Sequence, residues 1–427
     1  MYDYHADIVW TVNGALFAAL ILTGAAIFLS ALIKDRLWAA RRKRLLDIKH
    51  DIYEMVLSGR SASPVSPPPF ISKVTPQEFI DVETNRARDA VFFNDAEKQF
   101  LKSCFMAPEV IAKFERIAMR RGNLWRRIEA IISLGYTRTR PAEDTLGGLL
   151  YSKDAYVAYF AMISLGQIKT VRSGRMLLEF LRKGTSNDKK IFSILDGFPP
   201  QIADDIVRLT YDGDPRVRFW AAKLLSRFDA KKYADTLERL SRDGTDEVRA
   251  AACESLGNAG LRESARALIE SLKDPSWLVK RNAVMALEKV MGGEAVPEVI
   301  GLIDDASWSV SGAVKDIMTT HVESALPYIE KFLAGKDEIA MRYSVLALED
   351  SGYLARLLRD AASGKAGPRV MHLLEGIMKS GMHSGLEAVL GTFDMDTRSG
   401  AIKVLSGIDA GLADHIDKKI KGLIGEP

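Results

Sequence analysis

Histidine and cysteine are the residue types of this sequence best suited to bind a metal or to act as a nucleophile. The six histidines are His5, His50, His321, His372, His383 and His415. None is followed directly by glutamate, and two lone histidines such as His372 and His383 are more typical of surface or core positions than of a metal centre. The two cysteines, Cys104 and Cys253, lie far apart, and we expect both to be reduced, buried thiols. We therefore expect no metal ion and no cofactor.

The short motifs that carry nucleotide-binding or catalytic chemistry are absent. The sequence has no G-x-x-x-x-G-K-[ST], G-x-G-x-x-G, G-x-S-x-G or H-E-x-x-H. Residues 186–189, SNDK, fit S-x-x-K formally but lie in a polar turn without companion motifs. Four aromatic residues with helical spacing would suit a pigment pocket but are more typical of a core: Tyr151, Tyr156, Tyr159 and Phe160. We therefore expect a protein that is not an enzyme and has no small-molecule substrate.

Residues 8–33 read IVWTVNGALFAALILTGAAIFLSALI, a run of 26 residues without a charged side chain. About 20 apolar residues are enough for a helix to cross a bilayer. Acidic residues precede this run and seven basic residues follow it within residues 34–49. The positive-inside rule then predicts an uncleaved, single-pass anchor in the inner (cytoplasmic) membrane, with the N-terminus outside and the rest cytoplasmic. The alternative is a buried core helix.

Residues 34–60 are predicted to form a basic juxtamembrane helix, and 61–75 a Ser/Pro linker that begins SASPVSPPPF. The basic run RRKR is Arg41, Arg42, Lys43 and Arg44. These cations would contact anionic lipid headgroups or serve only as a topology signal. The apolar stripe of the helix is Leu45, Ile48, Ile52 and Met55. Its spacing suits packing against a partner helix.

A pattern that recurs every 31 residues dominates the second half of the sequence. Its first position is Val217, Val248, Val279 and Val310. Its second, four residues later, is Ala221, Ala252, Ala283 and Val314, and its third, eight residues after the valine, is Leu225, Leu256, Leu287 and Met318. The i, i+4, i+8 spacing predicts a helix with one apolar face.

Polar residues mark where each of these helices begins. Three residues before each valine lies Asp214, Thr245, Ser276 or Ser307, and we predict that their side chains cap the helix. Two residues earlier lies a further aspartate: Asp212, Asp243, Asp274 or Asp305. The segments between the copies show helical apolar spacing too, with Pro297 and Pro327 expected in opening turns, where proline is tolerated.

Weaker copies extend in both directions. They include Asn123 with Leu134, Asp154 with Leu165, the segment around Leu195, and Asp337 with Leu348. We count about eight to ten units between about residues 110 and 420. A pair of helices in about 31 residues buries its apolar face only by stacking on its neighbours. The predicted fold is therefore all-α: an α-solenoid of stacked helical hairpins behind one transmembrane helix.

The repeated phrase D-x-(D/T/S)-x-x-V-(R/K)-x-x-A-x-x-x-L resembles the short HEAT repeat of the phycobilisome-lyase-like class. DGDPRVRFWAAKLL and DGTDEVRAAACESLG are the closest copies. The resemblance implies a ladder between neighbouring repeats, in which aspartates and cations meet. The aspartates would be Asp212, Asp243 and Asp274, and the cations Arg218, Arg249 and Lys280. Ser311 takes the place of the next cation and would break the ladder.

The same resemblance covers scaffolds and a few enzymes. HEAT-type di-iron hydroxylases bind their metal through repeated His-Glu pairs, which this sequence lacks. A bilin lyase would need a tetrapyrrole pocket, for which the four aromatic residues named above are the candidates. A phycobilin-lyase-like enzyme or chromophore-binding protein therefore stays as an alternative.

Two surfaces stand out as candidates for binding. Trp277 and Trp308 occupy equivalent positions in adjacent units, where they would either fill space between helix starts or form an exposed hot spot for a protein partner. The candidate partner-binding set is Trp277, Trp308, Arg218, Arg249 and Lys280. Residues 111–140 hold eight basic and two acidic side chains. Their clustered cations, candidates for an anionic partner or lipid, are Arg120, Arg121, Arg126 and Arg127.

A net charge of +3 over 427 residues makes a bulk nucleic-acid binder a weak alternative, and no nucleic acid is expected. We predict a membrane-anchored cytoplasmic scaffold that binds and organises or regulates a partner protein, such as an envelope-building enzyme complex. The membrane-tethered nucleic-acid binder is the second alternative. The predicted organisation is anchor 1–33, basic helix 34–60, linker 61–75, helical N-terminal cap 76–110 and solenoid 111–427.

Overall fold

The computed structural model of the chain describes residues 39–40, 42–54, 71, 73–84, 106–184, 187–228 and 231–424. All regular structure in these residues is helical. The predicted membrane segment 8–33, Arg41, Met55 and Cys104 lie outside them. So do most of the predicted linker 61–75 and residues 85–105 of the predicted N-terminal cap. Among the helices that are described, none is both long and apolar enough to cross a membrane.

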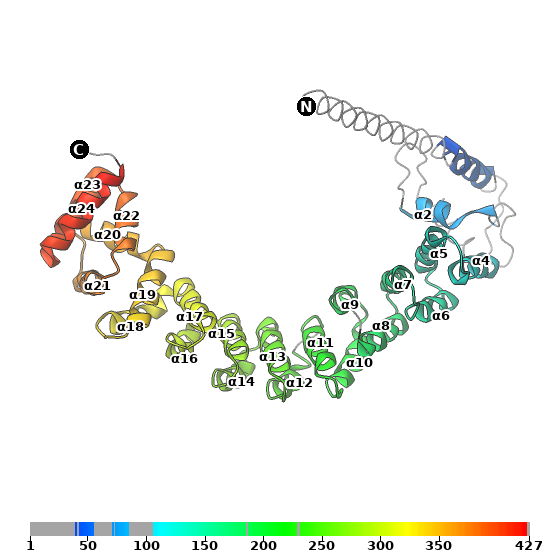
Figure 1. Cartoon of the computed structure of the whole chain (residues 1–427), viewed down its shortest axis with the longest axis horizontal. Helices are drawn as coiled ribbons and strands as arrows, with labels where there is room; N and C mark the ends of the chain where they lie inside the picture. The colour runs from blue at the N-terminus through cyan, green and yellow to red at the C-terminus, as the bar shows by residue number, and fades with distance from the viewer. Residues whose placement is uncertain are drawn as a thin grey trace, which may run out of the picture. The chain divides into compact units, whose positions relative to one another are not determined.

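The described residues divide into two compact units, one ending at Pro199 and one beginning at Pro200. The helices of the first unit are α2 (Pro76–Thr84), α4 (Pro108–Met119), α5 (Leu124–Thr137), α6 (Arg140–Leu149), α7 (Ala155–Ile168), α8 (Val171–Lys183) and α9 (Asp188–Leu195). Consecutive pairs pack together, since α4 contacts α5, α6 contacts α7, and α5 contacts α7 of the next pair (Figure 1).

The first unit begins with the helical residues 42–54, which pack against the chain that follows them. Leu45, Ile48 and Ile52, three members of the apolar stripe, are buried. Arg44 of the same helix forms an ion pair with Glu78 of α2, at 2.8 Å between Nε and Oε1. The partner of this stripe is therefore found within the chain itself.

Helix α2 is held against α5 by apolar and polar contacts. The ring of Phe79 lies 5.9 Å from that of Phe114 and 6.4 Å from that of Tyr136. The buried hydroxyl of Ser133 in α5 donates to the carbonyl oxygen of Pro76 at 2.9 Å. These contacts join the start of the described chain to its first helical pair.

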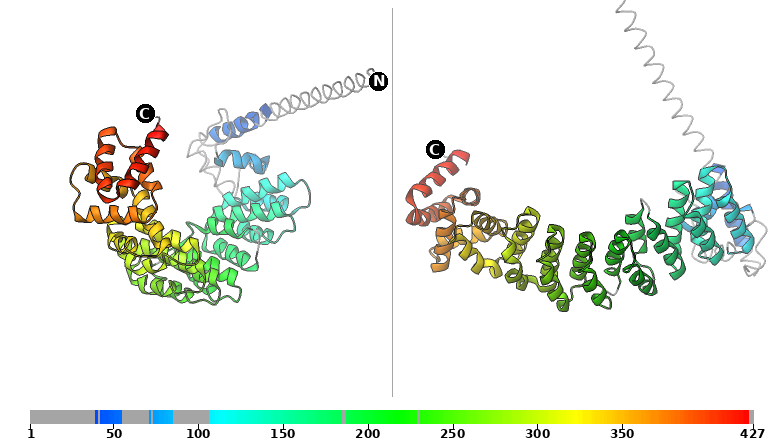
Figure 2. Two further views of the ribbon diagram at one scale, coloured as in Figure 1. Left: turned by 60° about the vertical axis from the view of Figure 1, so that its left-hand side comes forward. Right: turned by 60° about the horizontal axis from the view of Figure 1, so that its bottom comes forward.

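The second unit repeats a hairpin of a short first helix and a longer second helix. The short helices are α10 (Ala203–Leu209), α12 (Ala234–Leu240), α14 (Ala265–Ser271, preceded by the 3-10 turn Arg262–Ser264) and α16 (Val296–Val299, between the 3-10 turns Gly292–Ala295 and Ile300–Leu302). The longer helices are α11 (Pro215–Leu225), α13 (Asp246–Ala259), α15 (Trp277–Met291) and α17 (Trp308–Thr320). Figures 1 and 2 show α11, α13, α15 and α17 side by side in one row, with the short helices in a second row.

The array continues with helices of more irregular spacing. They are α18 (Val322–Leu333), α19 (Glu338–Asp350), α20 (Tyr353–Ala362), α21 (Pro368–Lys379), α22 (Ser384–Gly391), α23 (Met395–Ile408) and α24 (Ala410–Ile424). Here α20 contacts α23 and α22 contacts α24, so the packing at this end is no longer a simple row of pairs. Pro327, which we expected in an opening turn, lies inside α18.

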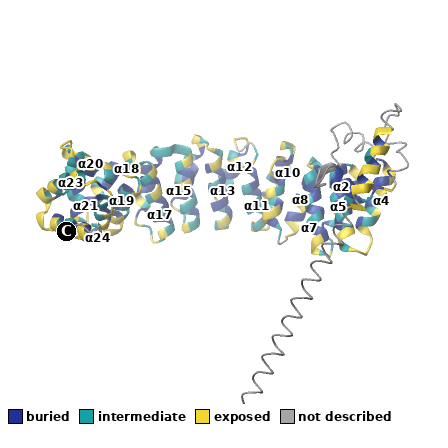
Figure 3. Cartoon of the chain, turned by 90° about the horizontal axis from the view of Figure 1, so that it is seen from above, coloured by how far each residue is buried: buried dark blue, intermediate teal, exposed yellow. Residues whose placement is uncertain are grey.

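The core of the second unit is built from the repeated apolar positions. The four valines of the repeat and the residues four and eight positions after them are buried without exception. Figure 3 shows buried residues on each of α11, α13 and α15. Apolar burial contributes about 25 cal/mol per Å², and each helix obtains it only against its neighbours. The predicted helical solenoid with HEAT-like repeats is confirmed by this packing.

The predicted helix caps are correct at Asp214 and wrong at the next three repeats. Asp214 accepts the N–H of Arg216 at 2.8 Å, whereas the side chains of Thr245, Ser276 and Ser307 make no capping hydrogen bond. Weaker copies that begin with Asn123, Asp154 and Asp337 do carry side-chain caps. The hydroxyl of Ser276 donates instead to Asp246 of the preceding repeat, at 2.9 Å.

Close packing of α13 against α15 depends on Gly257. A Cβ atom at this position would lie 2.7 Å from the Cα atom of Ala286, which is backbone and cannot rotate away. Gly312 in α17 has no heavy atom within 4 Å of an added Cβ, so it provides a matched helical control.

We expect Gly257→Ala to lower the free energy of unfolding of the purified full chain by about 1–3 kcal/mol, because the two helices must move apart. Gly312→Ala should raise it by about 0.5–1 kcal/mol through better helix propensity. Denaturant titration followed by circular dichroism measures both. Equal effects of the two substitutions would contradict the proposed packing constraint.

Candidate functional site

The cations of the repeat form a ladder that runs from one hairpin to the next. Arg218 donates from Nε and Nη2 to the two carboxylate oxygens of Asp243, both at 2.8 Å. Arg249 makes the same pair of bonds to Asp274, at 2.7 and 2.9 Å. Lys280 pairs with Asp305. Each cation thus contacts the carboxylate of the following repeat.

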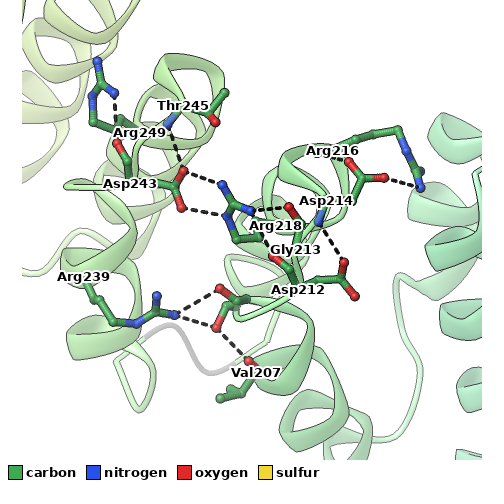
Figure 4. A network of polar contacts seen from close by, with 11 residues as sticks. Val207, Asp212, Gly213, Asp214, Arg216, Arg218, Arg239, Asp243, Thr245 and Arg249 are labelled. Carbon is green, nitrogen blue, oxygen red and sulfur yellow. Dashed lines mark hydrogen bonds and ion pairs between the residues drawn. The ribbon is translucent and has the colours of Figure 1, made fainter.

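The same cations also contact their own turn, but through its backbone. Nη1 of Arg218 donates to the carbonyl oxygen of Asp212 at 2.9 Å, and Nη1 of Arg249 donates to that of Asp243 at 2.9 Å (Figure 4). The resemblance to HEAT arrays predicted that aspartates and cations meet. The side-chain pairs are Arg218–Asp243 and Arg249–Asp274. Each cation therefore pairs with the aspartate of the following repeat and not with the aspartate of its own repeat.

The ladder aspartates also close the turn before each second helix. Oδ1 of Asp243 accepts the N–H of Thr245 at 2.9 Å, and Asp274 accepts that of Ser276 at 2.8 Å. Asp305 does the same for Ser307 at 2.9 Å. One carboxylate therefore shapes the turn and binds the cation of the preceding repeat. Asp212 closes the first of these turns in the same way, through the N–H of Asp214 at 2.9 Å.

The electrostatics of the ladder favour the charged forms of both partners. The hydrogen-bonded Asp243 carboxylate raises the pKa of Arg218, and Asp274 does the same for the pKa of Arg249. Partial burial acts to raise the pKa of Asp274, but the Arg249 guanidinium and the N–H of Ser276 outweigh it and lower that pKa. The pKa values of Asp243 and Asp305 are lowered against burial in the same way.

The ladder ends where both of its partners change. Ser311 replaces the cation, and its hydroxyl donates to the carbonyl oxygen of Asp305 at 3.0 Å, which preserves only the backbone contact. The residue 31 positions after Asp305 is Lys336, so the acceptor carboxylate is absent as well. Lys315 of α17 instead bonds to Asp350 of α19 at 2.6 Å. The predicted break at Ser311 is therefore accompanied by a substitute contact.

A further contact between repeats was missed in the sequence. Nη2 of Arg239 donates to Oγ1 of Thr210 at 2.7 Å, and its guanidinium lies 4.0 Å from the ring centroid of Tyr211. The recurrence of arginine at 208 and 239 was the available signal. This recurrence did not predict the contact, because Arg208 does not make the equivalent one and bonds within its own helix to Asp205.

We expect Asp274→Asn to lower the free energy of unfolding at neutral pH by about 2 kcal/mol, because it leaves the mostly buried Arg249 without a counter-charge. Carboxylates with lowered pKa stabilise the fold above their ordinary value of 3.8, and this contribution is lost as the pH falls through the lower folded-state pKa. The wild-type chain should therefore lose stability more steeply below about pH 4 than the variant does. Denaturant titrations between about pH 2.5 and 7, in steps of about half a pH unit, measure the free energy of unfolding of both chains. The prediction would be contradicted if the two free energies changed in parallel with pH.

Trp277 and Trp308 are exposed, so they do not fill the space between helix starts. They are 50% and 80% exposed and are the first residues of α15 and α17. The apolar stripe that begins at Val279 and Val310 turns its side chains toward the core, which leaves these first-turn indoles on the outside. This position explains the exposure.

The two indoles line one cavity of about 450 Å³ between α15 and α17, which we call the tryptophan groove. Met285, 39% exposed, adds an adaptable apolar side chain to it. Arg281, Glu288 and Asp316 supply charged groups of both signs. Neighbouring indoles with a polar rim are typical of sites that bind a protein segment.

The three ladder cations of the candidate partner-binding set are engaged within the chain. The side chains of Arg218, Arg249 and Lys280 are only 15–18% exposed and face the carboxylates described above. Their contact with a partner stays a prediction, whereas their structural role is visible in the ladder. The structure brings together only Trp277 and Trp308 from this set in the groove.

The basic candidates lie in the first unit. Arg120, Arg121, Arg126 and Arg127 line one cavity of about 510 Å³ at the turn between α4 and α5. Lys113 of α4 lines it too and was not singled out in the sequence. Of the basic run in the juxtamembrane helix, Arg42 and Lys43 are exposed and Arg44 pairs with Glu78.

The histidine and thiol candidates lie at different places in the described part of the chain. In that part of the chain, no group of three or more His, Cys, Asp and Glu side chains lies close enough to hold a metal ion. His372 lines one cavity while His383 and His415 line another. Cys253 is a buried free thiol, and burial raises its pKa to about 11, which makes the thiolate scarce at neutral pH.

The aromatic residues considered for a pigment pocket do not form a core. Tyr151 and Tyr156, expected to be buried, are exposed. The Tyr151 ring packs edge-on against Phe180 at 5.5 Å, with Nζ of Lys183 4.1 Å from its centroid. Helical spacing misled the prediction because Tyr151 lies in the turn after α6 and Tyr156 in the first turn of α7, outside the buried positions of these helices.

Comparison with known proteins supports the fold. Residues 194–256 and 233–318 match the sequence family of HEAT repeats, so residues 194–318 of this helical solenoid carry HEAT repeats. No curated protein matches the sequence.

Solved structures are similar to this chain at low identity, as three examples show. A crystal structure of an engineered protein is 15% identical with a TM-score of 0.33, and the match covers 70% of this chain and 98% of that chain. The complex of CpcE and CpcF of phycocyanin lyase from Nostoc sp. PCC7120 is 18% identical, with a TM-score of 0.28 and coverage of 62% and 94%. The E. coli protein YibA is 18% identical, with a TM-score of 0.32 and coverage of 67% and 98%.

Proposed function

We propose that this chain is a scaffold anchored in the inner membrane, whose cytoplasmic HEAT-repeat solenoid binds a protein partner through the tryptophan groove. The observation that carries the proposal is the pair of exposed indoles on adjacent repeats, Trp277 and Trp308, which line one cavity. HEAT repeats generally mediate contacts between proteins. The proposed action is recruitment or regulation of the partner, without catalysis.

The tryptophan groove has the properties of a binding hot spot. Exposed indoles cost free energy in water, and their burial by a partner recovers about 25 cal/mol per Å² of apolar surface. Trp277 and Trp308 are held by helices whose cores are fully packed, so little ordering is needed when a partner binds. A partner segment with apolar anchors and a few charges of both signs would complement Arg281 and Asp316.

The proposed anchor rests on residues 8–33, whose 26 uncharged residues suffice for a membrane-spanning helix. The basic residues that follow predict a cytoplasmic solenoid.

The partner is tested by purifying the tagged full chain from gently solubilised membranes. We expect a protein in stoichiometric amount that is lost from Trp277→Ala/Trp308→Ala, because removal of two hot-spot indoles typically costs about 2 kcal/mol or more each. Tyr156→Ala is the control, since this aromatic side chain is 65% exposed but lies in the first unit. Mass spectrometry and densitometry measure the partner.

Several results of this purification would overturn the proposal. If the double variant retained the partner, the groove would not be the site that binds it. A bound pigment in place of a protein partner would favour the lyase-like alternative. Circular dichroism of each variant checks that the fold is intact, so that loss of the partner is not a consequence of unfolding.

The anchor is tested by alkaline carbonate extraction of membranes. The full chain should stay in the membrane pellet, whereas Leu20→Arg/Ile21→Arg should release it, because an arginine at the centre of a bilayer costs about 2.5–3.5 kcal/mol. Extraction of the unmodified chain would contradict the anchor and favour the alternative of a buried core helix.

A further inference from the structure

The turn between α4 and α5 carries a pocket with a strong excess of positive charge. Its cavity of about 510 Å³ is lined by five cations and one carboxylate, Glu129. The cations of this basic pocket are Lys113, Arg120, Arg121, Arg126 and Arg127. Thr75 and Pro76 at the start of α2 complete one wall.

The charge of the basic pocket is poorly compensated by the chain. Among the residues that the structure describes, no carboxylate pairs with the guanidinium groups of Arg120, Arg121 or Arg126. Arg127 donates to the carbonyl oxygen of Ala118 at 3.1 Å, and Lys113 to that of Val74 at 3.0 Å. Carbonyl oxygens carry no net charge, so these two contacts do not offset the charge of Arg120, Arg121 and Arg126. The pocket therefore keeps an excess of positive charge that attracts an anion.

Two local features strengthen this potential. The pocket lies at the N-terminus of α5, a helix of 14 residues whose positive dipole end favours a bound anion. Burial, with the nearby charge of Arg44, lowers the pKa of Lys113 against the opposing effect of Glu78. A bound anion would reverse this shift, because it stabilises the ammonium form.

Exposed apolar side chains border the same turn. Met119 and Trp125 are 65% and 70% exposed, and each is followed directly in the sequence by an arginine of the pocket. Tryptophan beside arginine is typical of protein surfaces that contact a membrane interface, where the indole lies at the headgroup level and the cation binds phosphate. A soluble anion would need no such apolar border.

The proposed anchor would hold the pocket near the bilayer. Eight residues separate Ile33 from Arg42, and the nine steps along the chain span at most about 30 Å. The helical residues 42–54 are tied to α2 by the Arg44–Glu78 ion pair, and α2 contacts α5, which carries Arg126 and Arg127. This step rests on the proposed function, whereas the charge and the apolar border do not.

We infer that the basic pocket binds the phosphate of an anionic phospholipid headgroup, with Trp125 and Met119 against the lipid surface. The inference extends the proposed function from simple anchorage to recognition of lipid charge. Planar guanidinium groups suit phosphate oxygens because each can donate two parallel hydrogen bonds.

The test is calorimetric titration of the full chain in a neutral detergent with short-chain phosphatidylglycerol. We expect saturable binding at one site and a loss of affinity of about 100-fold in Arg120→Gln/Arg121→Gln/Arg126→Gln, which removes three contacts to anionic lipid. The matched control is Lys153→Gln/Lys189→Gln/Lys190→Gln, which removes the same charge from exposed positions of the same unit. This control should bind as the unmodified chain does.

Phosphatidylcholine and inorganic phosphate distinguish the source of the anion. Weak binding of both supports the inference. Binding of phosphatidylcholine as tight as that of phosphatidylglycerol would overturn charge recognition, and tight binding of inorganic phosphate would assign the pocket to a free anion. Equal loss in the two triple variants, or no lipid binding at all, would also overturn the inference, and thermal unfolding checks that both variants fold.

Failure of this inference is distinguishable from failure of the proposed function. A chain released by carbonate that still binds phosphatidylglycerol through the three arginines would retain the headgroup site and lose the anchor. A chain that stays in the membrane and keeps its partner, but does not discriminate phosphatidylglycerol, would retain the scaffold and lose the headgroup site.

Discussion

The aspartate that precedes each second helix is the constraint on which the second unit depends. Asp243 and Asp274 each accept an N–H of their own turn and the guanidinium of the preceding repeat. The turn fixes where the next helix begins, and the ion pair fixes how far the neighbouring hairpin is rotated against it. A carboxylate with two oxygens is the side chain that satisfies both demands at once.

This double use has a consequence for the surface. The ladder and the turn use side chains at other positions, so neither of them fixes the residue at the first helical position. Two repeats use that position for exposed tryptophans, Trp277 and Trp308, and the preceding repeats use Pro215 and Asp246. A periodic fold thus offers a non-periodic binding surface without loss of cohesion.

The two units differ in what they present. The second unit presents an apolar groove with mixed charge, which suits a protein segment, whereas the first presents the basic pocket, bordered by Trp125 and Met119. Both surfaces lie at helix starts and turns, where repeat proteins tolerate substitution because the core positions are elsewhere. Separate surfaces for a partner and for lipid are consistent with a scaffold that acts at a membrane.

The sequence by itself determined the helical repeat, since Val217 and its copies at 31-residue spacing must all face a core, and it also determined that Asp and Arg partners exist. It did not determine that Arg218 bonds to the aspartate of the next repeat, nor that the hydroxyl of Ser276 bonds to Asp246 of the preceding repeat instead of capping its own helix. Both depend on the rotation between hairpins, which one-dimensional spacing does not contain. The exposure of Trp277 and Trp308, and the convergence of Lys113 with Arg120 and Arg126, were decided by tertiary packing, because burial and electrostatic potential arise only when neighbouring helices are placed side by side.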